Sequence, residues 1–218
     1  MRIYVDSAER DAIRAALATG WVWGVTTNPT LLRRAGVRAA GVPGLVRDAL
    51  AAGARELHLQ TYADDAAGMV AEGRELAALD PVLRRVVVKI PATAAGYVAA
   101  RQLGERRVRV TLTAVYTVRQ AILAEAVGAA YIAVYLGRVR DGGGDPLALV
   151  GAMQQAIAAA GADLAILAAS VREGAEIESL AALGVATVTL PPVVLHTLLD
   201  SPATAAAAAT FLDDARAI

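Results

Sequence analysis

One lysine stands alone among the basic residues of this chain. Lys89, in the stretch RRVVVKIPAT, is the only lysine among 21 lysine and arginine residues. A guanidinium stays protonated, whereas an amine that is desolvated or lies near other cations can lose its proton and act as a nucleophile. The typical chemistry of such an amine is Schiff-base formation with a carbonyl compound. Lys89 is therefore a candidate nucleophile. The alternative is a lysine at a strand end whose ammonium reaches water.

Other polar residues also follow apolar, β-branched runs, at the points where those runs end. If the runs are parallel strands of a barrel, their carboxyl ends meet at one face, where barrel enzymes do their chemistry. The residues in these positions are Asp6, Thr26, Thr27, Asn28, Gln60, Lys89, Thr113, Tyr135, Arg138, Ser170 and Arg172. Ordinary roles compete with a shared site: Asp6 could cap a helix, Asn28 could open a turn, and each arginine could be a solvated surface charge.

The elements that must position these residues alternate along the chain. Helical stretches such as 8–20 and 118–130 carry apolar residues at helical spacing and end at glycine. The runs that predict strands are 2–6, 22–27, 55–62, 84–91, 107–113, 130–137, 164–170 and 186–191. Eight such strands, apolar on both faces, favour a (β/α)8 TIM barrel, with a doubly wound open sheet as the rival.

Alternation along two of these strands predicts which side chains share a face. His58 and Gln60 lie on one face of the third strand, and Val87 and Lys89 on one face of the fourth. Lys89 can then point into the barrel, with apolar neighbours below it that lower its pKa. We expect His58 in a lower layer of the barrel interior.

Composition narrows the class of protein. No break in composition divides residues 1–218, so we expect a single domain, with 203–216 an additional alanine-rich helix that packs on a neighbouring subunit. A net charge of +0 and scattered arginines argue against nucleic acid and anionic membranes as partners. Charges interrupt every apolar run, and the N-terminus lacks the apolar stretch of a signal peptide, so we expect a cytoplasmic protein.

Metal and cofactor chemistry finds little support in the residue types. The chain has no cysteine and only two histidines, which argues against disulfides, thiolate catalysis and a zinc site. The glycine-rich stretch RDGGGDP lacks the spacing and the lysine of a P-loop, so it predicts a turn at the rim. We expect no metal and no cofactor.

Five stretches together resemble the fructose-6-phosphate aldolase and small transaldolase family. They are VDSAERDAI, GVTTNPTLL, VVVKIPATAAG, TLTAVY and AASVRE, and the likeness runs nearly end to end. The resemblance implies a class I aldolase with its Schiff-base lysine on the fourth strand, where Lys89 falls. It implies that this lysine attacks the ketone of a sugar phosphate, giving a carbinolamine, an iminium, and then an enamine once the carbon–carbon bond breaks.

The resemblance also implies roles for the other residues. Asp6 would hold substrate or transfer protons, and Gln60, Thr113 and Tyr135 would hold a water beside the reacting carbon. Sugar hydroxyls would meet Asn28 and Thr26. The phosphate would bind Arg138, Ser170 and Arg172, since arginine suits bidentate phosphate recognition. A homo-oligomer, a decamer of two pentameric rings, is implied as well.

Within the family, two positions separate the branches. Transaldolases typically carry glutamate and phenylalanine where this chain has Gln60 and Tyr135, a pairing that protects the enamine until an aldose acceptor arrives. The pairing here favours an aldolase that converts fructose 6-phosphate into dihydroxyacetone and glyceraldehyde 3-phosphate, with transaldolase as the alternative. A non-covalent phosphosugar-binding or isomerase barrel, and a structural oligomer with a vestigial pocket, remain open.

Two departures from the family pattern also carry expectations. Trp21 and Trp23, in GWVWG, could narrow the pocket or fill a subunit contact. Gly137 stands directly before Arg138, and a glycine there predicts a loose phosphate segment.

Overall fold

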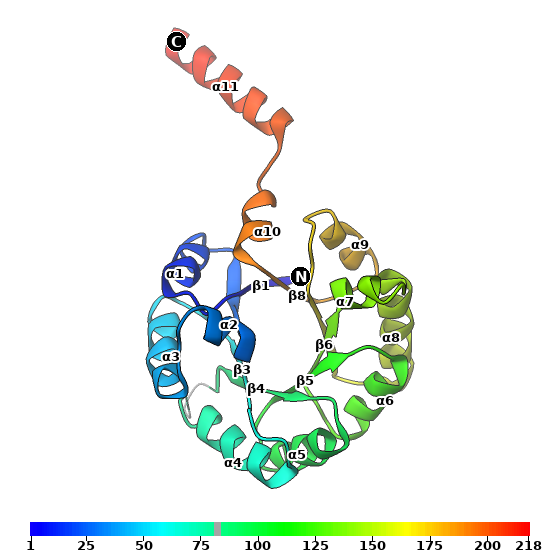
Figure 1. Cartoon of the computed structure of the whole chain (residues 1–218). Coiled ribbons are helices and arrows are strands. Elements are labelled where there is room, and N and C mark those ends of the chain that lie inside the picture. Colours follow the sequence, from blue (N-terminus) through cyan, green and yellow to red (C-terminus); the bar gives the residue numbers. More distant parts are fainter. Residues whose placement is uncertain (81–83) are drawn as a thin grey trace.

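The strands of this protein close into a parallel barrel in the order β1 to β8 (Figure 1). The computed structural model describes residues 1–80 and 84–218. Because β1 pairs with β8, the predicted (β/α)8 barrel is confirmed and the open doubly wound sheet is wrong. The strands are β1 (Arg2–Asp6), β2 (Val22–Thr26), β3 (Leu57–Gln60), β4 (Val86–Pro91), β5 (Val110–Val115), β6 (Tyr131–Tyr135), β7 (Ala165–Ala169) and β8 (Thr187–Leu190).

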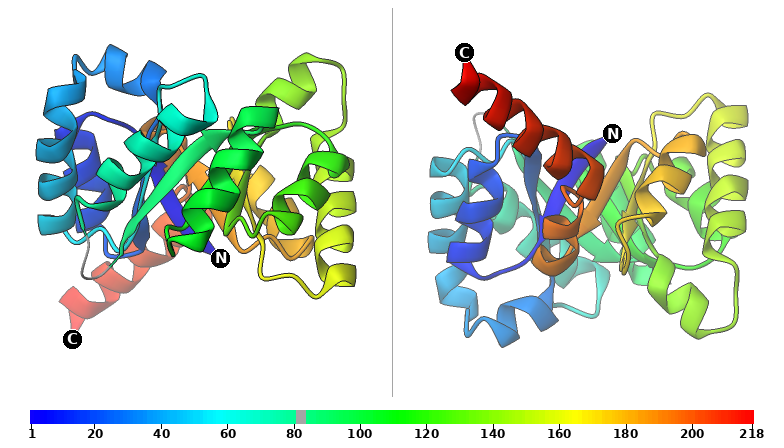
Figure 2. Two further views of the ribbon diagram at one scale, coloured as in Figure 1. Left: turned by 90° about the horizontal axis from the view of Figure 1, so that it is seen from below. Right: turned by 90° about the horizontal axis from the view of Figure 1, so that it is seen from above.

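Helices surround this barrel between successive strands (Figures 1 and 2). Predicted helix ends at Gly20 and Gly128 are confirmed, since both glycines adopt the left-handed conformation, with φ of 80° and 75°. The helices are α1 (Arg10–Ala18), α2 (Pro29–Arg34), the 3-10 turn η1 (Ala39–Gly41), α3 (Val42–Ala51), α4 (Ala66–Ala77), α5 (Ala94–Glu105), α6 (Val118–Ala126), α7 (Leu136–Asp141), α8 (Pro146–Ala160), α9 (Glu176–Ala182), α10 (Pro192–Thr197) and α11 (Pro202–Ala217).

The last helix, α11, projects away from the barrel (Figures 1 and 2). It contains no buried residue, although Phe211 and Leu212 are large and apolar and are 69% and 52% exposed. Its range agrees with the predicted helix over 203–216. None of the helices in the described ranges has both the length and the apolar composition that crossing a bilayer requires.

Apolar side chains form two separate cores. The larger one joins the outward faces of the strands to the helices, as the continuous apolar runs predict for a parallel sheet. A smaller cluster fills the barrel interior and contains Tyr4, Val87, Tyr131, Ala133 and Leu167. Since side chains alternate along a strand, Asp6, Lys89, Tyr135 and Ala169 lie on the same inner face, one step nearer the carboxyl end.

Strand register brings the carboxyl-end residues level with one another. Asp6 is opposite Thr26 on the neighbouring strand, and Gln60 is opposite Lys89. The apolar interior cluster therefore forms a floor beneath a ring of polar residues at one end of the barrel.

Candidate active site

A cavity of about 450 Å³ opens at the carboxyl ends of the strands. This volume lies within the range of small-molecule sites. The lining residues come from seven of the strands or the segments that follow them, and from α2 and α7: Asp6, Asn28, Pro29, Thr30, Leu31, Arg34, Gln60, Lys89, Tyr135, Arg138, Leu167, Ala169, Ser170 and Thr189.

The amine of Lys89 lies at the base of this cavity. The side chain is 4% exposed, and Nζ donates a hydrogen bond to the carbonyl oxygen of Thr27 at 3.1 Å. Burial lowers the pKa of Lys89, and the charge of Asp6 opposes that change. A lysine that simply reaches water from a strand end is thereby excluded. The prediction that Lys89 points into the barrel above Val87 is confirmed.

Asp6 faces the same cavity from the first strand. Its Oδ1 accepts a 2.6 Å hydrogen bond from Thr26 Oγ1. Burial raises the pKa of this carboxyl group, while Lys89 and the Thr26 hydrogen bond oppose the change. The helix-cap alternative is wrong, because α1 has Glu9 at its N-cap and that residue's backbone N–H donates to Ser7 Oγ.

Thr26 is a correction to the predicted set of substrate-binding residues. Its side chain is fully buried, and its hydroxyl lies 2.6 Å both from Asp6 Oδ1 and from Thr189 Oγ1. A group with no exposed surface cannot touch a ligand in the cavity, so Thr26 instead orients the Asp6 carboxyl group.

Tyr135 and Thr113 form a pair at the ends of β6 and β5. Their hydroxyl oxygens are 2.9 Å apart, and only Tyr135 lines the cavity, since Thr113 is 1% exposed. Burial raises the pKa of Tyr135, while the Thr113 hydrogen bond opposes this change, so the phenol keeps its proton at neutral pH. Tyr116 packs edge-on against the Tyr135 ring, with centroids 6.0 Å apart. Gln60 completes this part of the wall.

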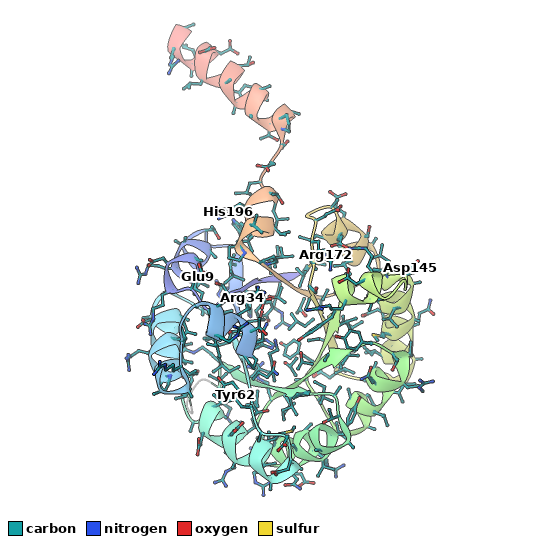
Figure 3. The ribbon with its side chains drawn as sticks, in the orientation of Figure 1. Glu9, Arg34, Tyr62, Asp145, Arg172 and His196 are labelled. Carbon is teal, nitrogen blue, oxygen red and sulfur yellow. The ribbon has the colours of Figure 1, made fainter. Side chains whose placement is uncertain are left out.

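Asn28 has both roles that the sequence left open. It caps α2, because its Oδ1 accepts a hydrogen bond from Leu31 N at 3.0 Å, and it also lines the cavity. The short helix that it caps ends with Arg34, which lines the cavity as well and lies over the barrel mouth (Figure 3). The mouth thus has a cation on α2 in addition to the one predicted on α7.

Arg138 and Ser170 lie together on the opposite wall. Between them, Gly137 N donates to Ser170 O at 3.0 Å, and a Cβ at position 137 would come within 2.7 Å of that oxygen. A side chain therefore cannot fit there without shifting the backbone. The prediction of a loose segment is wrong, because Gly137 is needed for close packing.

Arg172 is not among the cavity-lining residues. Its Nη2 donates to Asp141 Oδ2 at 2.6 Å on the exposed rim, near the position labelled in Figure 3. Of the predicted phosphate-binding residues, Arg138 and Ser170 line the cavity. The Nε of Arg172 lies beside Gly137, as the Ser170 hydroxyl does, but its guanidinium is paired with Asp141.

Backbone strain marks this end of the barrel. Ser170, which follows β7, and Ala114, in the irregular part of β5, have φ of 57° and 60°. Residues other than glycine rarely adopt this conformation, and those that do are concentrated at functional sites.

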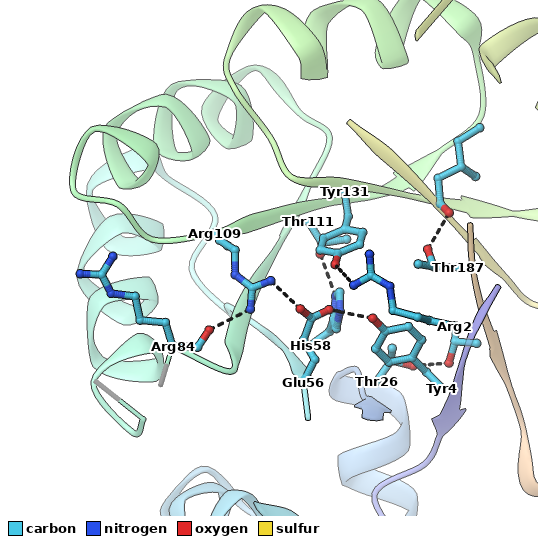
Figure 4. Close-up of polar contacts among 12 residues, drawn as sticks. Arg2, Tyr4, Thr26, Glu56, His58, Arg84, Arg109, Thr111, Tyr131 and Thr187 are labelled. Carbon is cyan, nitrogen blue, oxygen red and sulfur yellow. Dashed lines mark hydrogen bonds and ion pairs between the residues drawn. The ribbon is translucent and has the colours of Figure 1, made fainter. Parts of the chain in front are cut away.

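A buried polar layer lies below Lys89 (Figure 4). Glu56 accepts hydrogen bonds from Tyr4 at 2.8 Å and from Arg109 at 2.5 Å, and it lies 3.0 Å from Nε2 of His58. Burial opposes ionisation of Glu56, yet His58, Arg109 and Tyr4 together lower its pKa to about 2. Burial lowers the pKa of His58, which is fully enclosed. The expected position of His58 in a lower layer is confirmed.

The two tryptophans do not line the cavity. Trp23 packs against the interior cluster, with Arg2 and Arg55 over its ring, and Trp21 packs against the outer core. Narrowing of the pocket by these rings is excluded. The stretch RDGGGDP joins α7 to α8 as a turn, where Asp145 caps α8.

Sequence reasoning missed two side chains of the site. Thr189 alternates with Thr187 along β8, a signal that could have placed it on the inner face. Arg34 had no comparable signal, because its position depends on how α2 turns back over the barrel. Thr27 was predicted at this end of the barrel, but it contributes its carbonyl oxygen to Lys89. Within residues 1–80 and 84–218, no group of three or more histidine, cysteine or carboxylate residues could hold a metal ion.

Comparison with solved structures reveals the same fold in proteins of very different sequence. A flavocytochrome b2 variant matches with a TM-score of 0.66 at 12% identity, covering 90% of this chain and 58% of its own. A mandelate oxidase variant with an FMN adduct matches with a TM-score of 0.60 at 16% identity, covering 90% and 66%. This chain spans about two thirds or less of those proteins, and at such low identity the likeness extends to the barrel alone.

Sequence comparison is more specific. Residues 3–218 match the family described as Transaldolase/Fructose-6-phosphate aldolase. A probable transaldolase of Pelotomaculum thermopropionicum is 34% identical over 214 residues, which cover 98% of this chain and 97% of that protein. A probable transaldolase of Thermus thermophilus is 36% identical over 222 residues, with the same coverage. This chain therefore belongs to the transaldolase/fructose-6-phosphate aldolase family.

Proposed function

We propose that this protein is a class I aldolase that cleaves fructose 6-phosphate to dihydroxyacetone and glyceraldehyde 3-phosphate, and forms it in reverse. The observation that carries the proposal is the environment of Lys89: the only lysine of the chain is buried at the base of a ligand-sized cavity, with a carboxyl group facing it. Such an amine is the group that attacks a ketone to form a Schiff base.

The Lys89 and Asp6 pair supplies the protons for this step. Burial lowers the pKa of the amine and raises that of the acid, so both changes favour the neutral amine and the protonated carboxyl group. The neutral amine attacks C2 of the ketose, and Asp6 donates its proton to the carbonyl oxygen, which gives the carbinolamine. Loss of that oxygen as water yields the iminium.

Cleavage then breaks the bond between C3 and C4. A base removes the proton of the C4 hydroxyl, the aldehyde forms at C4, and the bonding electrons move into the iminium to give an enamine on Lys89. A water held by Gln60 and by Tyr135, whose phenol Thr113 orients, is the base that we propose. This role is supported by the direct contact of the two hydroxyl groups and by the position of Gln60 on the same cavity wall.

The phosphate of the departing aldehyde requires cations away from the lysine. Arg138 and Ser170 form one wall, and Arg34 reaches the cavity from α2. Charge-assisted hydrogen bonds from a guanidinium to a phosphate are strong and fix its orientation. We assign Arg138 and Ser170 to the phosphate and Asn28 to the sugar hydroxyls. Arg172 can also bind the phosphate, but only after its guanidinium releases Asp141.

The choice between aldolase and transaldolase depends on the fate of the enamine. A proton delivered to the enamine carbon gives an iminium that water hydrolyses to dihydroxyacetone, and the phenol of Tyr135 is a proton donor at the cavity wall. This favours the aldolase. Transaldolase, in which the enamine waits for an aldose phosphate, is the alternative, and the name of the related proteins supports it.

The deciding experiment has two parts. Borohydride added with fructose 6-phosphate should reduce the iminium and leave a stable mass adduct on the peptide that contains Lys89, whereas Lys89→Met should give none. Absence of the adduct in the native protein would favour a non-covalent sugar-phosphate barrel. Fructose 6-phosphate supplied without an acceptor should then release dihydroxyacetone over many turnovers. Release that stops at one equivalent and resumes with erythrose 4-phosphate would establish the transaldolase instead.

We also propose that the protein is a homo-oligomer in which α11 packs on a neighbouring subunit. The support is a helix with no buried residue that nevertheless carries Phe211 and Leu212. Large apolar side chains gathered on an exposed helix mark an interaction surface.

A further inference from the structure

A second cavity opens at the opposite end of the barrel, where β4 and β5 begin. Its volume is about 520 Å³. We call it the arginine cavity, because five of its nine lining residues are arginines: Arg74, Arg84, Arg106, Arg107 and Arg109, with Ala77, Ala78, Val86 and Val108. No acidic side chain lines it, although the chain as a whole is electrically neutral.

Most of these arginines are free to bind a ligand. Arg109 is engaged, since Nη1 donates to Glu56 and Nη2 donates to the carbonyl oxygen of Arg84 (Figure 4). Arg106 donates to the carbonyl oxygen of Gln102. In the described part of the chain, the side chains of Arg74, Arg84 and Arg107 form no ion pair.

Backbone conformation is a second, independent observation. Arg84 and Arg107 have φ of 51° and 59°, a region that disfavours any residue with a side chain. Within residues 1–80 and 84–218, glycine adopts positive φ at seven positions, each at a helix end: Gly20, Gly36, Gly53, Gly128, Gly143, Gly161 and Gly184. Arg107, just after α5, and Arg84, just before β4, also have positive φ, but neither position is occupied by glycine.

Three of the four strained residues that are not glycine in the described ranges line one of the two cavities. Ser170 lines the candidate active site, Arg84 and Arg107 line the arginine cavity, and Ala114 lines neither. Strain of this kind persists where the surrounding structure enforces it, and it is concentrated at active sites and ligand-binding sites. Glycine would relieve the strain at both arginine positions, so its absence there is consistent with a use for the guanidinium groups.

We infer that the arginine cavity binds an anion that contains a pyrophosphate group. Guanidinium groups bind phosphate oxygens in bidentate pairs, and two linked phosphates offer more oxygens over a longer span than one phosphate does, so they can engage more of these arginines at once. Inorganic pyrophosphate and a nucleoside diphosphate or triphosphate share this chemistry. The cavity is large enough for either, and Val86 and Val108 provide apolar surface for a nucleoside.

Isothermal titration calorimetry at one fixed ionic strength tests this inference on the full chain. Inorganic pyrophosphate should bind saturably at one per chain, at least about tenfold more tightly than orthophosphate. Parallel titrations with ADP and ATP distinguish the two sources, because tighter binding than pyrophosphate indicates that a nucleoside contributes. The absence of saturable binding by all of these anions would overturn the inference.

Variants locate the binding. The double variant Arg74→Gln, Arg106→Gln should weaken pyrophosphate binding at least about tenfold, since it removes two contacts and keeps Arg109 on Glu56. A matched control, Arg47→Gln, Arg119→Gln, removes two exposed arginines from α3 and α6 and should bind as the native chain does. If both double variants lost the same amount of pyrophosphate affinity, the binding would come from the overall surface charge, and the proposed site would be refuted.

A third variant separates this cavity from the candidate active site. Arg138→Ala should leave pyrophosphate binding unchanged, and abolished binding there would place the anion at the other end of the barrel and overturn the inference. The remaining rival is an acidic segment of another subunit. That rival would be established by two results together: the native chain binds no pyrophosphate, and the variant Arg74→Gln, Arg106→Gln loses its oligomeric state in sedimentation.

Discussion

Replacing Tyr135 with phenylalanine tests the assignment of the aldolase reaction most directly. The change removes one oxygen, which lies 2.9 Å from Thr113 Oγ1, and keeps the ring against Tyr116. Losing a neutral hydrogen bond of this kind costs about 1 kcal/mol of stability, which lowers the melting temperature by roughly 2–4 °C in a chain of this size. The fold should therefore survive.

The effect on catalysis should be much larger than the effect on stability. A positioned proton-transfer group contributes about 10²- to 10⁴-fold to a rate, so release of dihydroxyacetone from fructose 6-phosphate without an acceptor should fall by that factor. Cleavage itself and transfer to erythrose 4-phosphate should fall less, because an acceptor removes the enamine without protonation. The assay is therefore the ratio of dihydroxyacetone release to transfer, measured over many turnovers.

A neighbouring tyrosine provides the control. Tyr116 is 42% exposed and packs on Tyr135, so Tyr116→Phe removes a hydroxyl from the same region without removing the Thr113 contact. It should leave the ratio unchanged. If Tyr135→Phe also leaves release of dihydroxyacetone at the native rate, the phenol does not protonate the enamine and the reason for preferring the aldolase is lost.

Four further outcomes follow from the geometry. Lys89→Arg should abolish turnover, because a guanidinium cannot lose its proton, and near-native activity in steady-state assays would contradict the Schiff-base mechanism. Arg138→Ala should weaken the binding of phosphorylated substrates by about 1.5–3 kcal/mol and leave the binding of unphosphorylated substrates unchanged. An equal rise in KM for both kinds of substrate would show that Arg138 does not bind the phosphate. Glu56 has a folded pKa of about 2 against an ordinary 4.5, so the stability that it contributes, about 3 kcal/mol, is complete above pH 4.5 and is lost as pH falls toward 2. Denaturant unfolding at several pH values should show this acid loss in the native chain and less of it in Glu56→Gln. Phe211→Ser with Leu212→Ser should lower the oligomeric state measured by sedimentation, whereas a monomeric native chain would end the subunit-contact proposal.

The barrel could be predicted because its signal is repeated and local. Eight apolar runs, each followed by a helical stretch, leave few arrangements that bury both faces of every strand, and the closed order of strands is the expected one. Alternation then oriented Lys89 and His58 correctly, since the side-chain period of a strand is independent of its neighbours.

The details of the site depend on which neighbouring groups form hydrogen bonds with each polar side chain, and the spacing of residues along the chain does not reveal this. Thr26 ends its strand like the cavity-lining residues do, but Asp6 and Thr189 take its hydroxyl. Arg172 ends up on Asp141, 31 residues away in sequence, instead of in the cavity. Alternation places Glu56 on the same inner face as His58, but the sequence does not show which groups satisfy its buried carboxylate, because Tyr4 and Arg109 come from other strands or their flanks.

The use of a single lysine now has a physical explanation at both ends of the barrel. Beneath the cavity, Arg109 compensates a buried carboxylate, a task that needs a cation which cannot lose its charge. A lysine there could neutralise and leave Glu56 unpaired. At Lys89 the requirement is opposite, since an arginine in that enclosed position would keep a proton that the chemistry has to remove. A permanent charge therefore suits the ion pair with Glu56, whereas the proposed Schiff-base chemistry requires a basic side chain that can lose its proton, and Lys89 is the only lysine of the chain.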